Sequence, residues 1–379
     1  MNGPGIGLST GVLLLVFGTA LVLIKHAGRL TRIDVPDARR LHKTPTPRGG
    51  GLAMPFAVSL AAVAFHFLTG SKRADVLLAV LAFALPNGIL GVVDDYHPLK
   101  SRWKFGIQIL LAIGFVFFVG KVTHLDTAPD GLLPLGFFAA PFTVLWLVWS
   151  TNVYNFMDGM DGLAAGSGLL FFATLAALGW GAPAVAWVAV FGAAACLGFL
   201  VVNYPPAKIF MGDGGALFVG ALLGALAVLV GLAPPPAIEG AAGAAASIGY
   251  GKAAGLFSAI VGDPPPLART AAAPFVAAAL AQGSFLWDAT YTLFARIVRR
   301  EDWLHPHKRH LFQRLATAGW PHSRVRRLYA GLGLAGSAAA LALTYGAPWV
   351  AGAALAGALV VFAAVTWLTE RIERDTASR

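Results

Sequence analysis

Long apolar runs, each close to the length of a membrane-crossing helix, alternate with short polar segments along the chain. A helix needs roughly 20 apolar residues to cross a hydrocarbon core of about 30 Å. The pattern therefore predicts an all-α, polytopic membrane protein of about eleven transmembrane helices. The expected spans are 8–25, 51–69, 75–93, 105–121, 136–152, 163–180, 182–202, 216–233, 271–295, 328–345 and 347–368.

The same pattern indicates the domain organisation. No internal repeat of fixed period is evident, so residues 1–379 are expected to form a single transmembrane domain. Residues 234–270 are rich in Pro, Gly and Ala but poor in large apolar residues. We predict that this segment is an external loop.

Composition supports the membrane class. Hydrophobic residues make up 57% of the chain, charged residues make up 12%, and the mean hydropathy is +0.71. A soluble domain has about 25% charged residues. The single cysteine, Cys196, lies in an apolar span, which indicates a packing role.

The basic residues predict the orientation in the membrane. All but five of the 28 Lys and Arg fall on one side of the predicted helices, which we assign as cytoplasmic. No basic residue precedes the first span, so we expect it to be retained, with the N-terminus outside and the C-terminus cytoplasmic. The cations sit in short membrane-proximal loops, so contact with membrane lipids is expected and nucleic-acid binding is not.

Three acidic patches fall on that cytoplasmic side. Asp94 and Asp95 end one span, Asp158 and Asp161 follow another, and Asp213 precedes a third. A carboxylate at the bilayer centre costs about 2.5–3.5 kcal/mol, so these residues are expected at helix ends or in a wet cleft. Their oxygen atoms suit Mg²⁺, with Mn²⁺ as an alternative, beside a phosphate-bearing substrate. Taken alone, Asp213 favours a helix N-cap.

Two of the patches carry further information. Asp94 and Asp95 point about 100° apart on a helix, so one is expected to face the reacting phosphate and the other to orient a metal-bound water or a neighbouring lysine. Asn152, Asn155 and the two aspartates of the second patch recur at every third position, before glycines that break a helix. This polar helix end suits a sugar, a uridine or hydrated Mg²⁺.

Two basic segments are candidates for binding phosphate. The segment around His42, Lys43 and Arg48 combines cations with prolines and with glycines that let backbone approach a ligand closely. The segment around His307 and His310 again gathers imidazoles and cations. A simple positive-inside connector and a solvated basic face are the alternatives for the two segments.

In this order and between these spans, the motifs resemble the polyprenyl-phosphate N-acetylhexosamine-1-phosphate transferase family. The resemblance covers residues 8 to about 330. It implies transfer of a sugar 1-phosphate from a UDP-sugar to undecaprenyl phosphate, with Mg²⁺ and release of UMP, in the bacterial inner membrane. A homodimer is compatible with it.

The resemblance also implies residue roles. Asp94, with Asp95 beside it, would lie near the lipid phosphate as the catalytic pair. Metal binding would fall to Asp158 and Asp213, and Phe210 would lie against the uracil. The candidate substrate-binding residues are His42, Lys43, Arg48, Lys104, Asn152, Asn155, Asp161, Phe210, His307, Arg309 and His310.

One departure from the family pattern bears on the substrate. Phe312 and Gln313 stand where several members have further histidines. The resemblance then favours a small donor, a UDP-N-acetylhexosamine, and the branch that initiates O-antigen or capsule. The alternatives are a phospho-MurNAc-pentapeptide translocase and a transporter of an anionic metabolite. A transporter would favour polar residues at mid-membrane and repeat symmetry, and neither is found.

Overall fold

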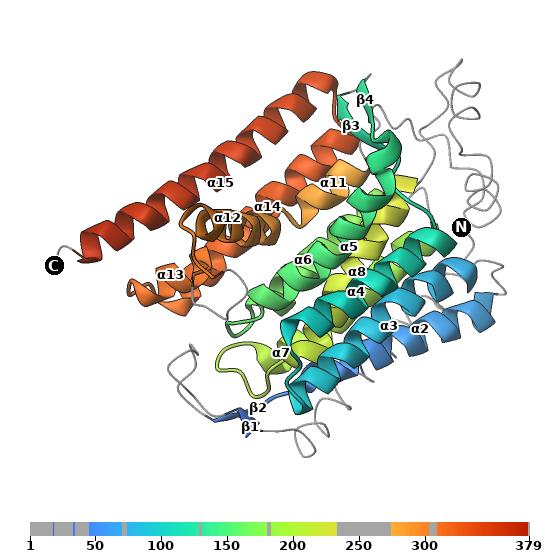
Figure 1. The fold of residues 1–379 in the computed structure, drawn as a ribbon, viewed down its shortest axis with the longest axis horizontal. Helices are drawn as coiled ribbons and strands as arrows, with labels where there is room; N and C mark the ends of the chain where they lie inside the picture. The colour runs from blue at the N-terminus through green and yellow to red at the C-terminus, as the bar shows by residue number, and fades with distance from the viewer. Residues whose placement is uncertain are drawn as a thin grey trace.

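The computed structural model describes residues 18, 33–34, 45–69, 74–128, 131–179, 183–232, 274–302 and 309–377, which form a helical bundle (Figure 1). The predicted all-α class is confirmed. The helices are α2 (Ala53–Thr69), α3 (Ala74–Tyr96), α4 (Ser101–Phe118), α5 (Ala139–Met157), α6 (Leu163–Leu178), α7 (Pro183–Asn203), α8 (Gly212–Leu232), α11 (Pro274–Ala281), α12 (Gly283–Val298), α13 (Leu311–Thr317), α14 (His322–Tyr345) and α15 (Pro348–Ala377), with short 3₁₀ turns η1 (Gly50–Leu52) and η2 (Gly136–Phe138).

Two small hairpins lie at opposite ends of the bundle (Figure 1). β1 (Ile33–Asp34) pairs antiparallel with β2 (Thr46–Pro47), in the register Ile33 to Pro47. β3 (His124–Ala128) pairs antiparallel with β4 (Gly131–Pro134). The end that carries β1, β2 and α13 is the end where the acidic patches meet.

Helix α8 is the centre of the bundle. After its first two residues it contains only Gly, Ala, Leu, Val and Phe, and such an all-round apolar helix is expected to be buried. In the structure, 89% of the most apolar 18-residue stretch of α8 is buried, whereas the corresponding value for α4 is 17%. It packs most extensively against α3 and then against α5. Helix α8 therefore lies inside the bundle and α4 at its rim.

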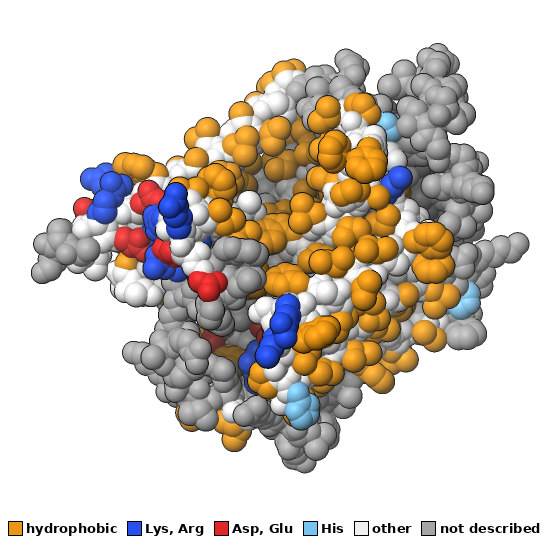
Figure 2. Space-filling model, in the orientation of Figure 1, with side chains coloured by type: hydrophobic (Ala, Val, Ile, Leu, Met, Phe, Trp, Pro, Cys, Tyr) orange, Lys and Arg blue, Asp and Glu red, His pale blue; other side chains and the backbone are white. Residues whose placement is uncertain are grey.

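The described helices are suited to a membrane. Seven are long and apolar enough to cross one, and Gly50–His66 and Leu163–Leu178 form shorter apolar helices. Figure 2 shows hydrophobic side chains over the body of the bundle, while charged side chains gather at one end, around α13 and the C-terminal part of α15. This confirms a polytopic membrane protein. The predicted span 8–25 and loop 234–270 lie outside the described residues, apart from Gly18, which is helical.

Helices at the end with the acidic patches continue beyond the apolar runs that predicted them. Helix α3 reaches Tyr96 rather than residue 93, and α5 reaches Met157 rather than residue 152. Helix α8 begins at Gly212 rather than residue 216. An apolar run reflects the thickness of the hydrocarbon core, whereas the helix itself can extend into the aqueous interface. Asp94, Asp95 and Asp213 are therefore carried on helix ends, whereas Asp158 and Asp161 lie in the turn between α5 and α6.

The predicted span 271–295 is wrong as one continuous helix, because the structure divides it at Gln282. The N–H of this residue donates to the Ala279 carbonyl at 3.0 Å, a tighter turn than an α-helix makes. Its side-chain Oε1 accepts a hydrogen bond from the Ser150 hydroxyl at 3.1 Å, which satisfies a polar group that is only 4% exposed. The break lets α12 leave the direction of α11.

Candidate active site

The segment before α8 is joined to the loop that follows β2. Backbone N–H groups of Gly49 and Gly50 donate to the Phe210 carbonyl at 3.0 and 2.9 Å. In return, Phe210 donates its own N–H to the Pro47 carbonyl at 2.8 Å. A Cβ at Gly51 would lie 2.6 Å from Met211 Cγ. The close approach predicted for these glycines is therefore made to Phe210 and Met211 of the protein itself.

Arg48 lies between two of the predicted carboxylates. Its Nη2 is 2.5 Å from Asp213 Oδ1 and 3.1 Å from Asp95 Oδ1. Burial alone would lower the pKa of Arg48, but the charges of Asp213, Asp95 and Asp158 raise it above its ordinary value. The guanidinium is thus held charged at a point where three acidic residues converge.

Asp95 and Asp213 meet at the start of α8. The Asp95 carboxylate accepts hydrogen bonds from the backbone N–H groups of Asp213 and Gly214, both at 3.2 Å. A carboxylate is favourable at a helix N-terminus. Gly212 permits the turn, because its φ of 76° lies in the left-handed region that favours glycine. Asp213 lies in the first turn of α8 rather than before it, and it accepts from Arg48, while Asp95 supplies the cap.

Asp94 has different partners from its neighbour, as expected for adjacent helical residues. Its Oδ2 accepts from Lys104 Nζ at 2.6 Å and its Oδ1 accepts from the Leu99 N–H at 2.7 Å. The side chain is 9% exposed. Lys104, from the first turn of α4, is therefore brought to the acidic pair.

The end of α5 presents the second patch. Asn152 is turned into the bundle, where its Nδ2 donates to Gln108 Oε1 at 2.7 Å and joins α5 to α4. Asn155 is half-buried in the last turn. Asp158 follows the helix, and Asp161 Oδ2 accepts the Ala207 N–H at 3.1 Å. The four residues therefore do not point to one place.

Asp158 is in a strongly electrostatic environment. Burial raises the pKa of Asp158 to about 7; Arg48 opposes this effect, and the neighbouring carboxylates of Asp213, Asp95 and Asp161 add to it. Carboxylates that raise one another's pKa are stabilised when a cation joins them.

The donor chemistry fits Mg²⁺, although the described residues contain no group of three or more His, Cys, Asp or Glu placed to hold a metal. Mg²⁺ keeps several waters and is often bound by one or two carboxylates together with substrate phosphates. Asp158 and Asp213 supply two such carboxylates close enough to influence each other's charge. The remaining ligands would come from a bound substrate and from water.

The remaining predicted residues are distributed as follows. Phe210 is half-buried and its backbone joins the loop after β2. Arg309 Nη1 pairs with Glu301 Oε1 at 3.0 Å. His310 is the N-cap residue of α13, and its ring stacks on Phe156 of α5 with the ring centroids 5.9 Å apart. The predictions for His42, Lys43 and His307 lie outside the described residues.

Two further residues near the candidate site, Asp288 and Arg326, are not among the residues predicted from the sequence. Asp288 is only 1% exposed and accepts hydrogen bonds from the start of α13. The signal was present, because Asp288 is an acidic residue inside a predicted span. Arg326, from the first turns of α14, interacts electrostatically with Asp161.

A helical membrane bundle that gathers carboxylates and cations at one end is the arrangement expected of a membrane enzyme that handles phosphates. The chain matches the family described as glycosyl transferase family 4 over residues 77–231. It is 30% identical over 305 residues to a probable undecaprenyl-phosphate N-acetylglucosaminyl 1-phosphate transferase of Bacillus subtilis (strain 168), covering 79% of this chain and 74% of the relative.

Two further relatives extend the comparison. A decaprenyl-phosphate N-acetylglucosaminephosphotransferase of Mycobacterium leprae (strain TN) is 31% identical over 386 residues, covering 97% of this chain and 90% of the relative. A phospho-N-acetylmuramoyl-pentapeptide-transferase of Enterococcus faecalis (strain ATCC 700802 / V583) is 34% identical over 226 residues, covering 55% and 68%. The chain belongs to the polyprenyl-phosphate N-acetylhexosamine-1-phosphate transferase family and is a glycosyl-1-phosphate transferase.

Proposed function

We propose that the protein transfers an N-acetylhexosamine 1-phosphate from a UDP-sugar to a polyprenyl phosphate, undecaprenyl phosphate being the expected carrier, and releases UMP. The observation that carries this proposal is the extent of the match. The N-acetylglucosamine phosphotransferase of Mycobacterium leprae matches 97% of this chain, whereas the Enterococcus faecalis pentapeptide transferase matches 55%. The product would initiate a surface polysaccharide such as an O-antigen or capsule.

The cation and carboxylate cluster supports the chemistry. A lipid phosphate oxygen would attack the phosphorus that bears the sugar, and the bond from that phosphorus to the UMP oxygen would break. Two anionic groups must meet, and Arg48 and Lys104 supply positive charge at this point. Both Asp94 oxygens already accept hydrogen bonds, which makes this carboxylate a weaker nucleophile and supports direct displacement. When bound by Asp158 and Asp213, Mg²⁺ would neutralise charge on the diphosphate.

The residues that replace histidines of the family motif, Phe312 and Gln313, support a small sugar donor. Phe312 is fully buried, and Gln313 Oε1 accepts the His310 N–H at 3.3 Å. These two positions thus serve the packing and capping of α13. They do not supply the additional imidazoles that accompany the muramyl-pentapeptide donor in the family resemblance.

Purified protein is expected to release UMP from UDP-GlcNAc or a simple epimer or deoxy relative. The measurement is UMP release with a panel of UDP-sugars and with undecaprenyl or decaprenyl phosphate as acceptor, since the relatives named above use different lipids. A site that hydrogen-bonds one sugar hydroxyl can discriminate strongly between such donors. Turnover of UDP-MurNAc-pentapeptide with none of the simple donors would contradict the proposed substrate class.

We also propose that the acidic end of the bundle faces the cytoplasm. Lys100 and Lys121 are exposed and lie beyond the two ends of α4, whose 18 residues span about 27 Å at 1.5 Å per residue. In a Cys196→Ala background, Lys100→Cys is expected to react only with a thiol reagent added to the cytoplasmic side. Lys121→Cys is expected to react only from outside, and the reverse pattern would invert the proposed orientation.

A further inference from the structure

Asp288 is a buried carboxylate to which the proposed reaction assigns no role. It lies in the second turn of α12 and is 1% exposed. A buried carboxylate is costly unless it is paired and hydrogen-bonded. In this chain it accepts from backbone N–H groups of Leu311 at 2.8 Å and Phe312 at 3.2 Å, from the Thr292 hydroxyl at 3.2 Å, and from the Tyr329 hydroxyl.

Its remaining partner is His310. The imidazole Nδ1 lies 3.2 Å from Asp288 Oδ1. In a neutral imidazole, this contact places the proton on Nδ1 and makes Nε2 the acceptor nitrogen. The ring also stacks with Phe156 and with Phe312, at centroid distances of 5.9 and 6.1 Å and interplanar angles of 29° and 21°. Both the tautomer and the plane of the ring are therefore determined by neighbouring residues.

The position of α13 brings this imidazole to the acidic cluster. Phe156 is in the last turn of α5, two residues before Asp158. A Cβ at Gly159 would lie 3.1 Å from Phe312 Cζ, so the start of α13 packs against the turn that carries Asp158. Asp288 thus connects the buried side of α12 to a segment that borders the candidate active site.

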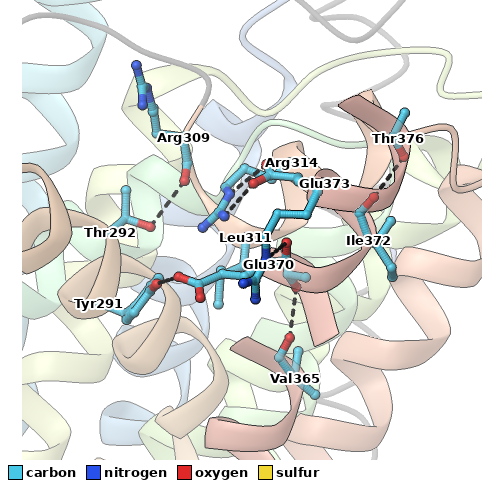
Figure 3. Close-up of polar contacts among 12 residues, drawn as sticks. Tyr291, Thr292, Arg309, Leu311, Arg314, Val365, Glu370, Ile372, Glu373 and Thr376 are labelled. Atoms are coloured by element: carbon cyan, nitrogen blue, oxygen red, sulfur yellow. Dashed lines mark hydrogen bonds and ion pairs between the residues drawn. The ribbon is translucent and has the colours of Figure 1, made fainter. Parts of the chain in front are cut away.

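Helix α13 has a second contact, with α15. Arg314 donates two hydrogen bonds to Glu373 of α15, at 2.7 and 2.5 Å, and Tyr291 of α12 donates to Glu370 (Figure 3). The bonds from Arg314 to Glu373 raise the pKa of Arg314. Helix α13 therefore keeps a strong anchor when the contact at Asp288 is weakened, and a local change there need not release the whole helix.

We propose that Asp288 is a positioning residue that acts through His310, holding the imidazole in one tautomer and orientation beside the site where the phosphates react. The proposal rests on the proposed function and on the sequence-based prediction that His310 binds the substrate. At metal sites, mutation of a group that orients a histidine ligand lowers metal affinity or activity by about 10- to 100-fold, and we expect an effect of the same order here.

The test is a double-mutant cycle on UMP release, using whichever UDP-sugar the unmodified protein turns over. Asp288→Asn is expected to lower kcat about 10- to 100-fold with little change in KM. In a His310→Gln background, the same substitution should lower kcat by less than about threefold, because the residue through which it acts is gone. A full effect in that background would overturn the proposal.

Tyr329→Phe is the matched control. It removes one hydrogen bond to the same carboxylate but leaves the His310 contact and the ring packing in place. It should lower Tm yet keep kcat within about threefold; a loss of kcat equal to that of Asp288→Asn would indicate a purely structural carboxylate. Asp288→Glu, which keeps the charge, replaces the asparagine variant in the cycle if that variant does not fold. Absence of UMP release by the unmodified protein with every donor would instead refute the proposed function.

Discussion

Replacing Asp213 with Asn is expected to lower kcat/KM by about 10³-fold or more while the protein stays folded. Asp213 lies 2.5 Å from Arg48 and close enough to Asp158 to alter its charge state, so it is part of the site that would bind the metal and the diphosphate. The change is isosteric, and Arg48 keeps its contact with Asp95 at 3.1 Å. UMP release should be measured across Mg²⁺ and Mn²⁺ concentrations, with Tm as the measure of folding.

Asp375→Asn provides the control for that experiment. Asp375 is exposed near the end of α15, where its Oδ2 lies 4.0 Å from Arg371 Nε. Exposed pairs contribute little, so its loss should leave both turnover and Tm unchanged. If Asp213→Asn retained near-normal turnover with the same Mg²⁺ dependence, Asp213 would be a residue of the helix terminus that serves only to pair Arg48.

Gly91→Ala is expected to lower turnover by about 10²-fold or more and to lower the free energy of unfolding by about 1–3 kcal/mol. A Cβ at Gly91 would lie 2.2 Å from the Asp213 carbonyl oxygen and 2.7 Å from the Gly214 nitrogen. These are backbone atoms, so α3 and α8 must separate. The separation would lengthen the two hydrogen bonds that Asp95 accepts from the start of α8.

Gly114→Ala on α4 is the matched substitution. A Cβ there would have nothing within 4 Å, and alanine is the better helix former. This variant should match the unmodified protein in turnover and equal or exceed it in Tm. Equal behaviour of the two alanine variants would show that α3 and α8 can adjust without disturbing the site.

Apolar run length was sufficient to predict the class of protein and most of the helices. It did not predict where helices end at the polar side, since α5 carries Asn152 and Asn155 within its last turns. The acidic residues at helix ends followed from the cost of burying a charge in a membrane. The same cost applies to Asp288, but a single carboxylate in a long apolar segment does not by itself interrupt the helix that the segment predicts.

The sequence did not predict which residues contact one another at this end of the bundle. Asn152 has the spacing of a site residue, yet its amide joins α5 to Gln108 of α4. Gly51 has the appearance of a ligand-binding glycine, yet the atoms that require it are those of Met211 and Gly215. Spacing along one helix shows which residues share a turn, but not which neighbouring helix they face.

Local hydrophobicity and charge can be read directly from the sequence. They determine the membrane class, the helical architecture and the presence of an acidic, cation-rich end. The pairing within that end depends on the packing of distant segments. Arg48 and Asp213 are 165 positions apart, and Asp95 reaches the start of α8 across 119 positions. Those contacts exist because glycines let α3 and the segment after β2 approach α8 closely, and close packing of that kind depends on the shapes of all the helices together.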